Sequence, residues 1–194
     1  AKMILVVRRE RSGLRHYVHL GTGNYHDRTA RLYTDLGLLT CDVVIGNDVH
    51  KLFLQLTSLG RVTKLQKLLQ SPFTVYKELL SKIEREVEHA RKGRPAHLIA
   101  RMNALVEPTI IQALYLASQA GVKIDLIVRG ICCLRPGVPG LSDNIHVRSI
   151  IGRFLEHTRV FYFLNDGKEE VYGASADWMD RNFFRRVEVA FLIE

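Results

Sequence analysis

Residues 74–130 alternate helical and strand-like patterns, and this alternation limits the folds open to the sequence. Apolar residues from Val75 to Ala90 recur close to the helical period, which predicts a helix between a capping Thr74 and a terminal Gly93. A second helix is predicted from Pro108 to Gly121, because proline suits a first helical turn and glycine a helix end. An apolar, strand-like segment follows each helix. This order indicates an α/β fold with a mixed sheet flanked by helices, whose ligands lie beyond the carboxyl ends of strands.

The first sixty residues follow a different pattern. Strands are predicted over Met3–Val7 and Leu14–Leu20, joined by a polar turn, so the two segments can form a hairpin. Asn47-Asp48 offers a cap for a short helix that runs through Leu56, and Gly60 is expected to end it.

A basic, weakly patterned segment between Gly60 and Pro72 indicates a domain boundary. We therefore expect a first unit over residues 1–60, a linker over 61–72 and a second unit over 73–194. Three more strands complete the second unit: Val160–Leu164, Glu170–Tyr172 and Val187–Ile193. Because the chain begins and ends in strand-like segments, we interpret both ends as points of truncation.

Composition restricts the class of protein and of partner. The net charge is +8, which suits a polyanionic partner such as nucleic acid, polyphosphate, nucleotide or anionic lipid. No apolar run approaches the ~20 residues that span a bilayer, although association with a membrane surface stays open. The three cysteines have neither a disulfide nor a zinc spacing, and this favours a reduced, cytoplasmic compartment.

Two clusters of polar residues resemble each other. In each cluster a cation on one strand precedes a hydroxyl residue and an amide or carboxylate after the next strand. The members are Lys2, Thr22 and Asn24 in the first cluster, and Arg159, Ser175 and Asp177, together with His157, in the second. This arrangement indicates two copies of one half-site.

The half-sites resemble those of the phospholipase D-like superfamily, which read His-x-Lys and then Gly-Ser/Thr-x-Asn. In such a site a histidine attacks phosphorus, and a cation neutralises the charge that builds on the phosphoryl oxygens. A second histidine from the other half serves as general acid or base.

Longer motifs narrow the resemblance. The segments "HLGTGNYHDRTARLYTD", "LIVRGICCLRPGVPGLSDNI" and "RSIIGRFLEHTRVFYF" resemble polyphosphate kinase of the histidine-phosphorylating type, along essentially the whole chain. The resemblance implies a phospholipase D-like fold, with a partial half-domain over 1–60 and a nearly complete one over 73–194. It also implies reversible transfer of the terminal phosphate of ATP to inorganic polyphosphate, through a phosphohistidine immediately before Ala1.

The resemblance assigns roles residue by residue. Tyr33, Arg129 and His157 match nucleotide contacts of the family, and His19 matches a further histidine near its active site. His157 and His19 are thus the expected catalytic residues. The expected phosphate ligands also include Lys2 and Arg159, supported by Thr22, Asn24, Ser175 and Asp177. Mg²⁺ is the expected cofactor, with ligands upstream of this chain, and ATP or ADP and polyphosphate are the expected partners, without specific nucleic-acid binding. Ala174 departs from the glycine that the family often has.

Other interpretations stay open at this point. His19 and Tyr33 could be core residues, and Arg129 could close a strand end with a salt bridge. The whole chain could be a phospholipase D-like phosphodiesterase or a non-catalytic polyanion-binding module. Lacking the nucleophilic histidine, the chain alone is expected to bind but not to turn over; a homo-oligomer is compatible with the sequence.

Overall fold

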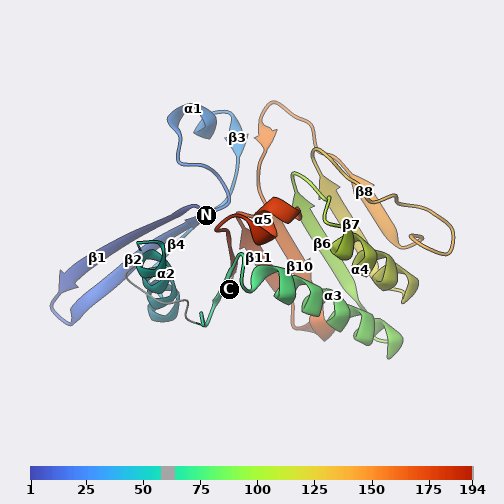
Figure 1. The fold of residues 1–194 in the computed structure, drawn as a ribbon, viewed down its shortest axis with the longest axis horizontal. Helices are drawn as coiled ribbons and strands as arrows, with labels where there is room; N and C mark the ends of the chain where they lie inside the picture. The colour runs from blue at the N-terminus through green and yellow to red at the C-terminus, as the bar shows by residue number, and fades with distance from the viewer. Residues whose placement is uncertain (58–63, 194) are drawn as a thin grey trace.

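The computed structural model describes residues 1–57 and 64–193 (Figure 1). Its helices are α1 (Asp27–Ala30), α2 (Val43–Leu56), α3 (Val75–Arg91), α4 (Pro108–Gln119) and α5 (Asp180–Phe184), with a 3₁₀ turn, η1, at Asn165–Gly167. Its strands are β1 (Met3–Glu10), β2 (Gly13–Gly21), β3 (Tyr33–Thr34), β4 (Gly37–Thr40), β5 (Leu68–Gln70), β6 (His97–Met102), β7 (Lys123–Val128), β8 (Ile145–Arg148), β9 (Leu155–Glu156), β10 (Val160–Phe163), β11 (Glu170–Ala174) and β12 (Val189–Leu192). No helix in these described stretches is long and apolar enough to cross a bilayer.

The small sheet has the antiparallel order β1-β2-β4. Its β1-β2 hairpin confirms the predicted pair of strands, and the hairpin projects away from the rest of the molecule (Figure 1). One face of the sheet packs against α2 through a cluster that includes Val18 and Leu20. The other face has no helix packed against it among the described residues.

The start of α2 differs from the expectation. The helix begins at Val43 because Asp42 caps it, with its Oδ1 accepting a hydrogen bond from the Ile45 N–H at 2.8 Å. The cap predicted at Asn47-Asp48 is therefore wrong. The predicted helix end at Gly60 lies outside the described residues, as do residues 61–63 of the expected linker.

Asp48 instead stabilises the backbone that leads from α2 into the second unit. It is buried, and its Oδ2 accepts hydrogen bonds from three consecutive backbone N–H groups, those of residues 66–68. These bonds lead the chain into β5, which pairs with β12 in the large sheet. Part of the stretch expected as a linker is thus a strand, because a buried carboxylate organises its backbone.

The large sheet has the order β5-β12-β11-β10-β6-β7-β8. β6, β7 and β8 run parallel, and the other pairs are antiparallel. α3 and α4 lie side by side on one face (Figure 1), and they enclose a core with Phe161, Phe163 and Trp178. The expected mixed sheet flanked by helices is confirmed, as are α3, which follows Thr74, and α4, which starts at Pro108.

A two-stranded parallel sheet joins the loop after α1 to the second unit. β3 pairs with β9, which places Tyr33 opposite Leu155 and Thr34 opposite Glu156. The loop that follows β2 therefore lies beside the segment that leads into β10.

Candidate active site

Arg159 is the centre of the second polar cluster. Its guanidinium forms a two-pronged ion pair with Asp177, with Nε to Oδ1 at 3.0 Å and Nη2 to Oδ2 at 2.9 Å. Both side chains are buried, so removal of either one would leave the other as an unpaired buried charge, which is strongly destabilising. This ion pair and an N–H···O bond from the Asn103 backbone hold the pKa of Asp177 below its ordinary value, although burial acts in the opposite direction. The remaining Nη1 donates to the carbonyls of His157, at 2.9 Å, and Thr22, at 3.4 Å.

The bond to the Thr22 carbonyl connects the two expected half-sites. The start of the chain adds a second connection, because the nitrogen of Ala1 lies 2.6 Å from the Val187 carbonyl oxygen. Lys2 is the next residue, and its pKa is lowered. Burial is the main cause and the positive charge of Arg159 adds to it, whereas the negative charge of Glu188 acts in the opposite direction. The structure thus brings Lys2 and Thr22 of the first cluster together with Arg159 and Asp177 of the second.

His157 lies half-buried at this junction. Its backbone N–H donates to the Thr34 carbonyl at 3.0 Å, and its ring centroid is 5.1 Å from that of Tyr33. Burial, and next the positive charges of Arg159, Lys2 and Arg129, lower the pKa of His157 to about 4. The imidazole is therefore neutral near pH 7, and its buried Nδ1 has no hydrogen-bond partner within the described part of the chain.

Ser175 faces a carboxylate that the sequence did not single out. Its hydroxyl donates to Oε2 of Glu188, whose Oε1 accepts from Nδ2 of Asn182 at 3.0 Å. All three side chains are buried. The available signal was one carboxylate inside the apolar stretch "VEVAFL", because an isolated charge there needs a buried partner.

The two half-sites share one backbone arrangement. Thr22 exchanges N–H···O bonds with Leu36, donating to its carbonyl at 2.9 Å and accepting from its N–H on Oγ1 at 2.9 Å. Ser175 does the same with Val189, at 2.9 Å and 3.1 Å. The register that aligns these pairs places Asp35 where the second half has Glu188. Asn24, by contrast, is exposed, and it makes no hydrogen bond to the buried cluster within the described part of the chain.

Tyr33 and Arg129 line a neighbouring surface pocket of about 520 Å³. Apolar side chains, including Ile150 and Phe154, form much of the wall. Arg129 Nη1 donates to the Glu156 carbonyl at 2.7 Å, so the end of β7 is held by a hydrogen bond to a carbonyl instead of the salt bridge considered above. An aromatic ring, apolar walls and a cation suit a flat, anionic ligand.

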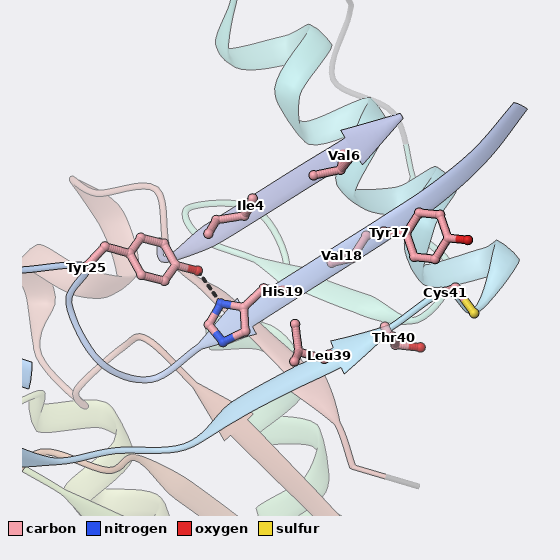
Figure 2. Close-up of a pocket in the computed structure, with 9 residues that line it drawn as sticks. All are labelled: Ile4, Val6, Tyr17, Val18, His19, Tyr25, Leu39, Thr40 and Cys41. Atoms are coloured by element: carbon pink, nitrogen blue, oxygen red, sulfur yellow. Dashed lines mark hydrogen bonds between the residues drawn. The ribbon is translucent and has the colours of Figure 1, made fainter. Parts of the chain in front are cut away.

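His19 lies away from this group, on the open face of the small sheet. Its Nδ1 is 2.6 Å from the Tyr25 hydroxyl, as Figure 2 shows, and its ring packs over Gly21 and Gly37. No hydrogen bond or ring contact among the described residues joins His19 to His157, so its catalytic role stays a prediction. Ala174 is buried in the core of the large sheet, where its methyl group packs with apolar residues.

Metal ligands are not assembled within the described residues. No group of three or more His, Cys, Asp and Glu side chains there could hold a metal ion. The described residues therefore provide no such ligand set for the expected Mg²⁺, and the position of its ligands stays a prediction.

The chain is similar to known proteins along its whole length. Residues 1–62 match the family model "Polyphosphate kinase C-terminal domain 1", and residues 68–194 match "Polyphosphate kinase C-terminal domain 2". The chain is 65% identical over 197 residues to the polyphosphate kinase of Paraburkholderia phytofirmans and 60% identical over 194 residues to that of Pseudomonas aeruginosa. All of this chain is covered, but only 29% and 28% of those relatives. The crystal structure of polyphosphate kinase from Porphyromonas gingivalis superposes with a TM-score of 0.92 at 40% identity, over 99% of this chain and 30% of that one.

Proposed function

The chain belongs to the polyphosphate kinase family, and we propose that it forms part of an active site that transfers the terminal phosphate of ATP reversibly to inorganic polyphosphate. In this proposal the phosphohistidine belongs to the position just before Ala1, and residues 1–60 and 73–194 are two phospholipase D-like halves. The observation that carries the proposal is the meeting of the two half-sites around Arg159, whose guanidinium contacts both His157 and Thr22.

The charges at this junction explain how phosphoryl transfer would be favoured. Lys2, Arg129 and Arg159 place enough positive potential at His157 to help hold its imidazole neutral. The same potential stabilises negative charge on phosphoryl oxygens in a partly buried site, where the effect of each charge is larger than in water. A neutral imidazole can accept a proton or orient a phosphate oxygen, so His157 would act as proton acceptor or as a positioning group.

The neighbouring pocket would bind the nucleotide. Tyr33 offers a ring for stacking on the adenine, and Arg129 offers donors for its phosphates. The distance of 5.1 Å between the Tyr33 and His157 rings would bring the nucleotide to the same junction. The net charge of +8 suits the polyphosphate chain, whose binding should weaken as salt rises. Mg²⁺, when bound, would neutralise phosphate charge.

The test uses the longest natural polypeptide that contains this sequence. With γ-labelled ATP we expect an acid-labile, base-stable protein label that ADP removes and polyphosphate accepts. His157→Gln should lower the rate of polyphosphate formation by ~100-fold or more, whereas His146→Gln, at an exposed position of β8, should leave it unchanged. Hydrolysis of DNA or phospholipid without a protein label would instead establish a phosphodiesterase and refute the proposal.

A further inference from the structure

Glu156 is the single acid among the described residues that line the pocket of about 520 Å³. The proposed function places an anionic nucleotide in this pocket, and a carboxylate repels phosphate oxygens unless a cation neutralises it. Arg101 supplies that cation, because its guanidinium forms an ion pair with the Glu156 carboxylate. The two side chains are 27% and 19% exposed, respectively, so solvent screens the pair only in part. A carboxylate at this place needs a function other than phosphate binding.

The same carboxylate connects two segments that lie far apart in the sequence. The Thr34 hydroxyl, on β3, donates to Oε2 of Glu156, on β9, at 2.6 Å, although the two residues are 122 positions apart. β3 and β9 contain two residues each, and a two-stranded pair alone is marginally stable in water. Backbone bonds at 2.8 Å (Leu155 to Leu32) and 3.0 Å (His157 to Thr34) hold the pair. The bond between Thr34 and Glu156 therefore adds a needed contact between the segments.

This short pair of strands also carries the groups expected to bind the nucleotide. Tyr33 precedes Thr34 on β3, and its ring centroid is 5.1 Å from that of His157. Arg129 comes from the end of β7, but its Nη1 donates to the Glu156 backbone carbonyl at 2.7 Å. Glu156 thus contacts the strand of Tyr33 through its side chain and the guanidinium of Arg129 through its backbone.

We propose that Glu156 is a positioning residue for the nucleotide, whose carboxylate holds Tyr33 and Arg129 at the spacing that a nucleotide bridges. The inference rests on the proposed function, since it concerns the same pocket. Two effects of removing the carboxylate oppose each other. Loss of a negative charge would by itself tighten ATP binding. Loss of the Thr34 bond would let the two segments separate and would weaken ATP binding. The second effect is the larger one here, because Arg101 already neutralises the charge.

Steady-state kinetics with the longest natural polypeptide that contains this sequence test the proposal. Glu156→Ala should raise the KM for ATP ~10-fold, while kcat and the KM for polyphosphate change by less than ~3-fold. Thr34→Val should change the KM for ATP in the same direction. The double variant should be no worse than Glu156→Ala, because both substitutions remove the same bond. Thr34→Ser, which keeps the hydroxyl, should keep the KM of the wild type.

Glu170→Ala is the matched control for a loss of stability alone. Glu170 accepts hydrogen bonds from Lys82 at 3.0 Å and from Arg85 at 2.8 Å, and it does not line the pocket. Its removal should lower the melting temperature and leave the KM for ATP unchanged. If Glu156→Ala does not fold, Thr34→Val alone carries the test.

The outcomes separate this inference from the proposed function. An unchanged or lower KM for ATP in Glu156→Ala, a fall in kcat alone, or an equal rise in KM in Glu170→Ala would overturn the positioning role only. A wild-type polypeptide that neither binds ATP in equilibrium dialysis nor forms polyphosphate would overturn the proposed function, and the role of Glu156 with it.

Discussion

Replacing His157 with glutamine should remove a pH-dependent loss of stability. The pKa of His157 is lowered from 6.5 to about 4 in the folded chain. At pH 8 the imidazole is neutral in both the folded and the unfolded chain, so its protonation does not change the free energy of unfolding. As the pH falls from 6.5 towards 4, the unfolded chain binds a proton that the folded chain does not, and the free energy of unfolding decreases.

The size of this loss follows from the pKa difference. At about 1.4 kcal/mol per pH unit the full shift corresponds to at most ~3.4 kcal/mol. His157 is only half-buried, and solvent screening reduces the effect, so we expect ~1.5 kcal/mol between about pH 7.5 and pH 4.5. His157→Gln should lack this part of the loss.

Urea unfolding at a series of pH values measures the difference, with the fluorescence of Trp178, the single tryptophan, as the signal. The quantity to compare is the free energy of unfolding of the wild type minus that of His157→Gln at each pH. His146→Gln, at an exposed position, should follow the wild type. A constant difference across this range, or a folded-state titration of His157 near 6.5 by NMR, would refute the lowering of the His157 pKa by burial and by the neighbouring cations.

Three further substitutions test contacts that stabilise the fold: one joins α2 to the segment that leads into β5, and two lie within the second unit. Asp48→Ala should lower the free energy of unfolding by ~3 kcal/mol, because the backbone N–H groups of residues 66–68 lose their acceptor; a loss below ~0.5 kcal/mol in urea unfolding would contradict this. Gly173→Ala should cost ~2 kcal/mol, since a Cβ there would lie 2.7 Å from the Phe191 ring; an unchanged melting temperature would count against it. Glu86→Gln should cost ~1–2 kcal/mol, because this buried carboxylate accepts two backbone N–H bonds and an amide offers one acceptor oxygen; hydrogen exchange at those amides should accelerate, and unchanged exchange would argue against the bonds.

The long elements could be predicted from the sequence because periodicity and end signals agree. α3, α4 and the strands at β6 and β7 each combine a clear apolar pattern with glycine or proline near an end. The short strands β3, β4, β5, β8 and β9 contain two to four residues each, which is too few for a period to show. The start of α2 was misplaced because Asp42 and Asp48 are both plausible caps by residue type, and only the fold shows that Asp48 faces β5.

The candidate site was predicted in part for a similar reason. The repeated order of cation, hydroxyl and carboxylate indicated Arg159, Ser175 and Asp177, and the structure brings them into one buried region. Glu188 was missed because its partner Ser175 is 13 residues away in the sequence and meets it only through β11-β12 pairing. His19 alternates with buried Val18 and Leu20, so its strand directs it to the other face of the sheet.

The apolar cluster beside α2 contains side chains from both sides of the predicted domain boundary. Val18 and Leu52, from before the boundary, pack with Leu68, Val189 and Phe191, from after it. Neither part can open without exposing the other part's side chains to water, so this cluster couples the stability of the two parts. A cut between them would separate two family segments and would expose to water the apolar side chains that each part contributes to this cluster.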